Sequence, residues 1–174
     1  LDSNDAETHF FLGSAQQEQE HFPEAEQCYE RALSINPEHA KANNNLGHIL
    51  QLRGEFDKAI YQFNRALKVA PDYPDAINNL GYALQQQGRL EEALSLYERV
   101  LTLDPDYAEA HNNIGNIHKE QGDFDAAVKK YDRALQINSN LAIAHFNRAD
   151  IKTFEPGDKE VTTLETLATN AENM

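Results

Sequence analysis

The sequence predicts an all-α chain built from repeated antiparallel helical hairpins. The first observation is a glycine that recurs every 34 residues, at Gly13, Gly47, Gly81 and Gly115. The second is a set of small, bulky and proline positions that keep the same period. Self-similarity at a fixed period of roughly 20–50 residues is typical of solenoids, in which one supersecondary unit stacks on the next. The period sets repeats at 6–39, 40–73, 74–107 and 108–141, with a divergent fifth unit from Ala142.

Three further sets of residues, which we call columns, recur with the same 34-residue period as the glycines. They are Ala25, Ala59, Ala93 and Ala127; Tyr29, Phe63, Tyr97 and Tyr131; and Leu33, Leu67, Leu101 and Leu135. Small residues let paired helices approach closely, and bulky residues at helical spacing fill the space between them. We therefore expect two packed helices in each repeat. Pro37, Pro71 and Pro105 close three repeats, and Ser139 stands at that position in the fourth.

Repeat 3 sets the expected helix bounds. The first helix is predicted from about Asp75 to Gln87, because Gly88 breaks it. The second is predicted over Leu90 to Leu103, because Pro105 cannot continue a helix. Toward the ends of the second helices lie Arg31, Arg65, Arg99 and Arg133. Cations at these positions suit the helix dipole, and contact with an anionic partner is the alternative role.

The period and these columns resemble the tetratricopeptide repeat family over nearly the whole chain. The resemblance implies a right-handed superhelical α-solenoid of antiparallel hairpins, whose first helices line a concave groove. Four units and the divergent fifth would give an open arc. The same resemblance implies binding of a protein or peptide in the groove, and it identifies no partner.

The two ends depart from the repeat. Residues 1–5 are a short polar lead-in. Within 142–174 we expect a first helix from Ala142 to Phe154 and then a last helix whose N-cap is Asp158. One apolar stripe on that helix predicts a cap over the last hydrophobic face, as solenoids require. The same segment also resembles the stretch that follows the repeats in bacterial proteins joining tetratricopeptide repeats to a sulfotransferase.

Composition limits the partners. The net charge is −14, from 15 Lys and Arg against 29 Asp and Glu, so the chain should repel nucleic acids and anionic membranes. No apolar run reaches the roughly 18 residues that span a bilayer, and the first residues do not show the charged-then-apolar pattern of a signal peptide, although the start at Leu1 is also that of a mature product or an excised domain. The single Cys28 leaves the compartment open, and we expect a cytoplasmic one. A monomer is the expected oligomeric state.

Paired asparagines on the first helices are the principal candidate site. Position 5 of the repeat holds Asn44, Asn78 and Asn112, and position 6 holds Asn45, Asn79, Asn113 and Asn147. Asparagine is a poor helix former, so something should offset its cost. One interpretation is a ladder of amides that grips the backbone of an extended peptide. The other is that the amides bond within the solenoid and hold adjacent first helices together. Different members of each pair can serve both roles.

The remaining groove candidates come from positions that the family directs inward. They are His48, Tyr82, Gln85, Asn116 and Lys119. Tyr82 is a candidate anchor, since tyrosine is frequent at interface hot spots, or else an ordinary surface residue. The position-6 asparagines also resemble the inner ladder of O-GlcNAc transferase repeats.

Several functions lack their residues. Tetratricopeptide co-chaperones hold a chaperone carboxylate with Lys and Arg at positions 5, 2 and 6 of consecutive repeats. In repeats 2 to 4 these positions are Asn44, Glu109 and Asn113, and the cationic clamp is missing in every other frame as well. No nucleotide, metalloprotease or nucleophile-elbow motif is present, and the histidine spacing fits no metal. We expect no cofactor, no metal and no catalysis.

Three functions therefore stay open. The chain is a scaffold that binds a protein or extended peptide, the substrate-docking region of a larger sulfotransferase or glycosyltransferase, or a structural self-assembly unit. The first is the one that we expect.

Overall fold

The computed structural model describes residues 5–151. Nine helices follow one another within this range, and none of its residues is in a strand. They are α1 (Ala6–Glu18), α2 (Phe22–Ile35), α3 (Ala40–Leu52), α4 (Phe56–Val69), α5 (Pro74–Gln86), α6 (Leu90–Leu103), α7 (Ala108–Glu120), α8 (Phe124–Ile137) and α9 (Ala142–Ala149). The all-α prediction is confirmed. In repeat 3 the predicted second helix matches α6 at both ends, and α5 begins and ends one residue earlier than expected.

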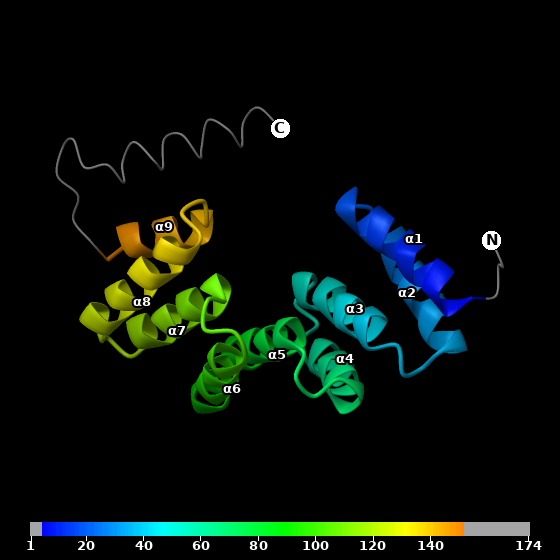
Figure 1. Ribbon diagram of the computed structural model, residues 1–174, viewed down its shortest axis with the longest axis horizontal. Coiled ribbons are helices and arrows are strands. Elements are labelled where there is room, and N and C mark those ends of the chain that lie inside the picture. The colour runs from blue at the N-terminus through cyan, green and yellow to red at the C-terminus, as the bar shows by residue number, and fades with distance from the viewer. Residues whose placement is uncertain (1–4, 152–174) are drawn as a thin grey trace. The chain divides into compact units, whose positions relative to one another are not determined.

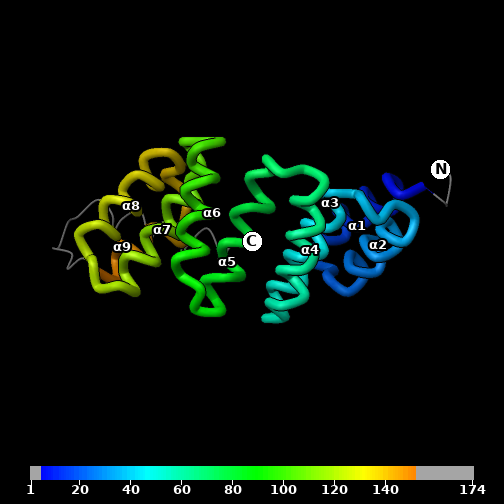
Figure 2. The backbone as a smooth tube through the Cα atoms, turned by 90° about the horizontal axis from the view of Figure 1, so that it is seen from below, coloured from blue at the N-terminus to red at the C-terminus, as the bar shows by residue number. Residues whose placement is uncertain are grey.

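The chain forms two compact units, Leu1–Leu96 and Tyr97–Met174, and the boundary falls within α6. In the first unit α1 pairs with α2 and α3 with α4, and each second helix also packs on the next first helix (Figure 1). In the second unit α7 pairs with α8, and α9 packs on both (Figure 2). Successive first helices also contact one another, as α1 contacts α3 and α3 contacts α5. This packing of consecutive helix pairs is the predicted solenoid arrangement, and its superhelical winding stays a prediction.

The glycine column allows each hairpin to close. A Cβ built on Gly47 would lie 2.6 Å from the ring of Phe63, and one on Gly115 would lie 2.5 Å from the ring of Tyr131. Both rings are fully buried. The close approach of paired helices that the small-residue positions predict is therefore observed in both units, and at these two glycines the group approached is an aromatic ring of the second helix.

The turn inside each hairpin needs a left-handed residue. Gly88 has φ of +74°, and Gly54 and Gly122 have similar values at the same repeat position. In repeat 1 the position is held by Glu20, with φ of 59°, although a side chain disfavours this conformation.

The turn between repeats is held by side chains from the next repeat. Position 4 holds Asn43, His111 and His145, and each side chain donates to the carbonyl oxygen of the position-32 residue of the preceding repeat, at 3.2, 3.0 and 2.9 Å respectively. Arg65 donates to the same carbonyl as Asn43, and Arg133 pairs with Asp106 of the preceding turn. These two members of the arginine column thus tie second helices to the turns before them, a contact that the sequence did not suggest.

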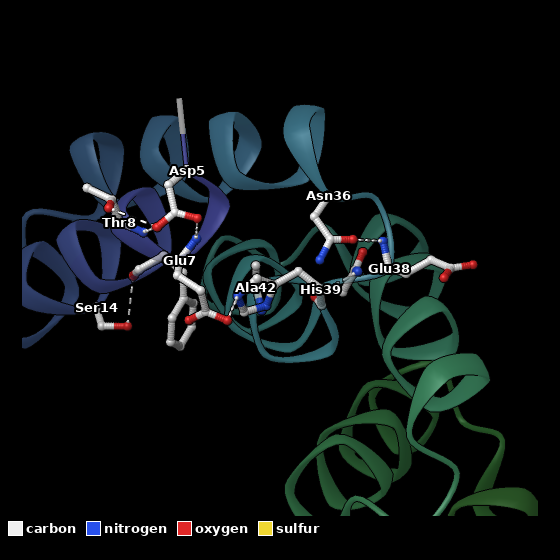
Figure 3. A network of polar contacts seen from close by, with 10 residues as sticks. Asp5, Glu7, Thr8, Ser14, Asn36, Glu38, His39 and Ala42 are labelled. Atoms are coloured by element: carbon white, nitrogen blue, oxygen red, sulfur yellow. Dashed lines mark hydrogen bonds and ion pairs between the residues drawn. The ribbon is translucent and has the colours of Figure 1, made fainter. Parts of the chain in front are cut away.

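The N-terminal cap and the first turn between repeats are drawn in Figure 3. Asp5 accepts hydrogen bonds from the backbone of Glu7 and Thr8, at 3.4 and 3.2 Å, and so caps α1. His39 caps α3 through Nδ1, which accepts from the amide of Ala42, and its Nε2 lies 3.4 Å from a carboxylate oxygen of Glu7. The neutral tautomer that this cap requires carries its proton on Nε2, facing Glu7.

Two expectations about the ends reach beyond the described residues. The last helix capped by Asp158 and the sulfotransferase-like segment both lie in 152–174, outside the described range. The helix predicted from Ala142 to Phe154 is described as α9 to Ala149, followed by a turn at Asp150. Within residues 5–151 no helix has the length and apolar character needed to cross a membrane.

Candidate functional site

The predicted site residues lie on the first helices of both units. Asn44, Asn45 and His48 are on α3, and Asn78, Asn79, Tyr82 and Gln85 are on α5. In the second unit Asn112, Asn113, Asn116 and Lys119 are on α7, and Asn147 is on α9. In the pairs on α3 and α5 the position-5 amide is buried and the position-6 amide is half-buried, whereas both amides of the pair on α7 are buried.

In the first unit, an amide bond joins two repeats. Asn79 donates from Nδ2 to Oδ1 of Asn44 over 3.1 Å, and Asn44 is only 6% exposed. Asn44 in turn donates to Oδ1 of Asn45 at 3.3 Å, and Asn45 donates to the hydroxyl of Tyr29 at 3.0 Å. Asn44 is therefore an internal link between α3 and α5, while Asn45 and Asn79 remain half-buried at its edge.

The second unit has the same kind of amide hydrogen bond between successive first helices, but more of its position-5 and position-6 asparagines are buried. Asn147 donates to Oδ1 of Asn112 at 3.0 Å and to Oδ1 of Asn116 at 2.9 Å. The hydroxyl of Tyr131 also donates to Asn116, at 2.9 Å, and Lys119 pairs with Asp150. Burial, with smaller effects from nearby carboxylates, raises the pKa of Tyr131 to about 12, so the hydroxyl keeps the proton that it donates.

The structure separates the two interpretations of the asparagines by residue. Internal bonding between first helices is observed for Asn44 with Asn79 and for Asn112 with Asn147. Asn78, Asn113 and Gln85 are also buried and engaged in interactions. Peptide gripping stays a prediction, and the half-buried Asn45 and Asn79 are the members placed to do it.

A polar pocket of about 310 Å³ opens beside Asn45 in the first unit. Ser14, Gln17 and Glu18 of α1, Tyr29 of α2 and Asn45 of α3 line it. The Tyr29 hydroxyl donates to Oε1 of Gln17 at 2.8 Å while accepting from Asn45. The pocket wall therefore consists of oriented amide and hydroxyl groups, which are suited to binding the amides of a peptide.

His48 extends this polar wall along α3. Nε2 of Gln17 lies 3.3 Å from Nδ1 of His48 and is a donor, so Nδ1 accepts and the ring proton is on the other nitrogen. Burial lowers the pKa of His48, which favours this neutral form. His48 is thus a fixed hydrogen-bonding group near neutral pH, without a cationic charge.

Aromatic side chains flank the amides of the first unit. Tyr82 is 36% exposed, as a groove anchor requires, and Phe11 on α1 is 64% exposed. Phe11 occupies position 6, the column that holds Asn45 and Asn79 in the next two repeats. Sequence reasoning left Phe11, Gln17 and the Tyr29 hydroxyl out of the site. Phe11 was detectable from its column, whereas the hydroxyl of a packing tyrosine gave no such signal.

The histidines have structural partners. His111 and His145 donate to turn carbonyls through Nε2, and no hydrogen-bond partner of their buried Nδ1 atoms is found among the described residues. Residues 5–151 bring together no group of three His, Cys, Asp or Glu side chains suited to a metal ion. These rings therefore serve the turns between repeats.

Family models agree with this architecture. Models described as tetratricopeptide repeat match residues 6–39, 38–106 and 73–140. These matches span nearly all of the four predicted repeats. No curated protein sequence matches the chain. The likenesses to sulfotransferase-linked repeats and to O-GlcNAc transferases are not confirmed by these comparisons.

Solved structures share the fold at low sequence identity. PilF of Pseudomonas aeruginosa is 22% identical with a TM-score of 0.74, covering 94% of this chain and 73% of PilF. MamA of Desulfovibrio magneticus RS-1 is 20% identical with a TM-score of 0.69, covering 80% of this chain and 79% of that one. YrrB, described as a tetratricopeptide repeat protein with an unusual peptide-binding site, is 20% identical with a TM-score of 0.68, covering 99% and 94%.

Proposed function

Because this chain belongs to the tetratricopeptide repeat family, we propose that it is a non-catalytic interaction module that binds an extended peptide segment of a partner protein. The binding face is the edge of α1, α3 and α5 in the first unit. A peptide-binding site has been described for YrrB, which shares the fold, and this is consistent with the proposal.

The observation that carries the proposal is the state of Asn45 and Asn79. Each spends one N–H on an internal bond, to Tyr29 and to Asn44 respectively, and each stays half-buried. A primary amide has a second N–H and an oxygen with two lone pairs. The internal bonds fix the orientation of these side chains, so little rotamer entropy is lost when a peptide backbone pairs with them.

Aromatic contacts supply the second part of the affinity. Phe11 and Tyr82 lie on the first and last of the three helices, at repeat positions that the family directs inward, so we expect a strand crossing all three to meet both rings. A hydrogen bond adds about 1 kcal/mol net, and an aromatic anchor at an interface contributes about 2 kcal/mol or more. Two amides and two aromatic anchors therefore predict micromolar affinity that tolerates many peptide sequences.

The test uses peptides selected from a random display library against the full chain. We expect selected peptides to bind with micromolar Kd, measured by fluorescence anisotropy. Phe11→Ser and Tyr82→Ser should each weaken binding about tenfold or more. Both side chains are exposed, so these changes should leave the fold intact, whereas Asn79→Ala would also remove the bond to buried Asn44.

The matched control is Tyr61→Ser. It makes the same chemical change as Tyr82→Ser in the same unit, but Tyr61 is 60% exposed on the second helix α4. Binding that survives Tyr61→Ser and is lost with Tyr82→Ser supports the proposed face. Selected peptides that bind both aromatic variants as tightly as the wild type would place the site elsewhere.

A further inference from the structure

Two grooves of the first unit lie away from the amides. One, of about 470 Å³, runs between α2 and α4 over the floor of α3, and the other, of about 600 Å³, runs between α4 and α6 over α5. Their linings occupy the same repeat positions, as Leu46 and Leu50 in one correspond to Leu80 and Leu84 in the other. We call them the outer grooves.

Helix packing explains why an outer groove exists. First helices α1, α3 and α5 contact one another in succession, but the backbones of α2 and α4, both fully described, do not approach closely enough to pack as the first helices do. Each second helix instead rests on the first helix of the next repeat. A furrow thus remains between α2 and α4, with Leu46 and Leu50 at its floor, 5% and 6% exposed. On its wall Tyr61 is 60% exposed, so its ring is accessible to an occupant of the groove.

The rim of this groove is acidic. Its carboxylates are Glu26, Glu30, Glu55 and Asp57, and its cations are Arg53 and Lys58, which leaves a net charge of −2. Both cations are already engaged, since Arg53 pairs with Glu26 and Glu55, and Lys58 pairs with Glu55. Glu30 and Asp57 are exposed without a cation bonded to them in the described part of the chain. An occupant therefore meets an apolar floor below a rim of net negative charge, in which Arg53 also acts on Glu30 and Arg65 stands over the Tyr61 ring.

We propose that the groove between α2 and α4 binds a basic amphipathic helix of a partner protein. A helix placed in a furrow between two helices buries one apolar face and presents its flanks to both rims. Leucine-class side chains fill the floor and stack on Tyr61, and Lys or Arg on the flanks faces Glu30 and Asp57. The acidic rim steers such a segment and disfavours an acidic one. This surface is distinct from the amide face and does not depend on it.

The experiment titrates the full chain into a fluorescein-labelled peptide of leucine and lysine. The peptide has about 18 residues, or roughly five helical turns, with its leucines on one face. We expect micromolar binding by anisotropy and a gain of helical circular dichroism on binding. Tyr61→Ser and the pair Glu30→Gln with Asp57→Asn should each weaken binding about tenfold. Tyr82→Ser and the pair Glu24→Gln with Glu109→Gln, exposed charges outside the groove, should not.

Three results would overturn the proposal. A scrambled peptide of the same composition that binds equally well would show attraction of any polycation to an acidic protein. Binding lost with Tyr82→Ser and kept with Tyr61→Ser would place the probe on the amide face. A peptide that binds without becoming helical would rule out the helical occupant.

Discussion

Replacing Gly115 by alanine tests the packing that defines each hairpin. The new Cβ would lie 2.5 Å from Cε1 of Tyr131, whereas ordinary contacts begin at 3.4 Å, so the ring must retreat by about 0.9 Å. That ring is fully buried, and its hydroxyl donates to Asn116 at 2.9 Å. The ring therefore cannot move without disturbing either its packing or this hydrogen bond.

Opposing effects decide the sign of the change. Alanine in a helix gains about 1 kcal/mol over glycine. Overpacking a core costs about 1–3 kcal/mol, and disturbing the Tyr131 hydrogen bond costs about 1 kcal/mol more. We therefore expect Gly115→Ala to lower the free energy of unfolding by about 1–3 kcal/mol. Gly47→Ala should cost less, about 0–2 kcal/mol, because its Cβ would lie 2.6 Å from the ring of Phe63, which has no hydroxyl hydrogen bond to disturb.

The assay is urea unfolding followed by far-ultraviolet circular dichroism, with the slope m checked for constancy. In a Tyr131→Leu background, where the ring edge is gone, Gly115→Ala should cost less than it does in the wild type, a coupling that a double-mutant cycle measures. Gly122→Ala is the control: its cost of about 1–2 kcal/mol comes from a φ of +80°, with no atom within 4 Å, so Tyr131→Leu should not relieve it. A Gly115→Ala variant more stable than the wild type would refute the packing argument, because helix propensity alone would then govern the site.

Three further predictions concern the amides, the histidines and the charge. Asn79→Ala should lower the free energy of unfolding by about 1–2 kcal/mol in the same assay, because buried Asn44 loses its donor; an unchanged urea midpoint would contradict the link. Burial lowers the pKa of His111 from 6.5, so its contribution to stability is complete above that pH and lost as the pH falls through the lower folded-state value. His111→Asn, which copies Asn43 at the same repeat position, should reduce the loss of stability between about pH 7.5 and 5.5, and equal losses in both proteins would argue against it. Finally, a gel shift at about 0.1 M salt should detect no micromolar binding to nucleic acid, given a net charge of −14.

Periodic packing was predictable because it depends on residue size. Gly115 and Tyr131 recur in phase with their counterparts, so the hairpin, its helix bounds and its small–large contact follow from the columns. The contacts at the turns between repeats were harder to predict from the sequence. Asn43, His111 and His145 differ in type yet make the same bond to a turn carbonyl, and only the structure reveals this equivalence. When different residue types make the same contact in successive repeats, the sequence shows no repeated residue that would reveal it.

The asparagine pairs show why site prediction from such columns stops short. Adjacent amides at positions 5 and 6 differ by about 100° around the helix, yet nothing in their chemistry tells which one turns inward. In the first unit Asn79 donates to Asn44 of the preceding repeat, and Asn44 is buried while Asn79 stays half-buried. In the second unit Tyr131 and Asn147 both donate hydrogen bonds to Oδ1 of Asn116. The amide oxygen of Asn116 is therefore already used inside the protein. The same motif therefore forms internal links in both units, and in the first unit it also leaves Asn45 half-buried beside a polar pocket. Removing Phe11 or Tyr82, which hold no part of the link, is consequently the sharper way to separate binding from stability.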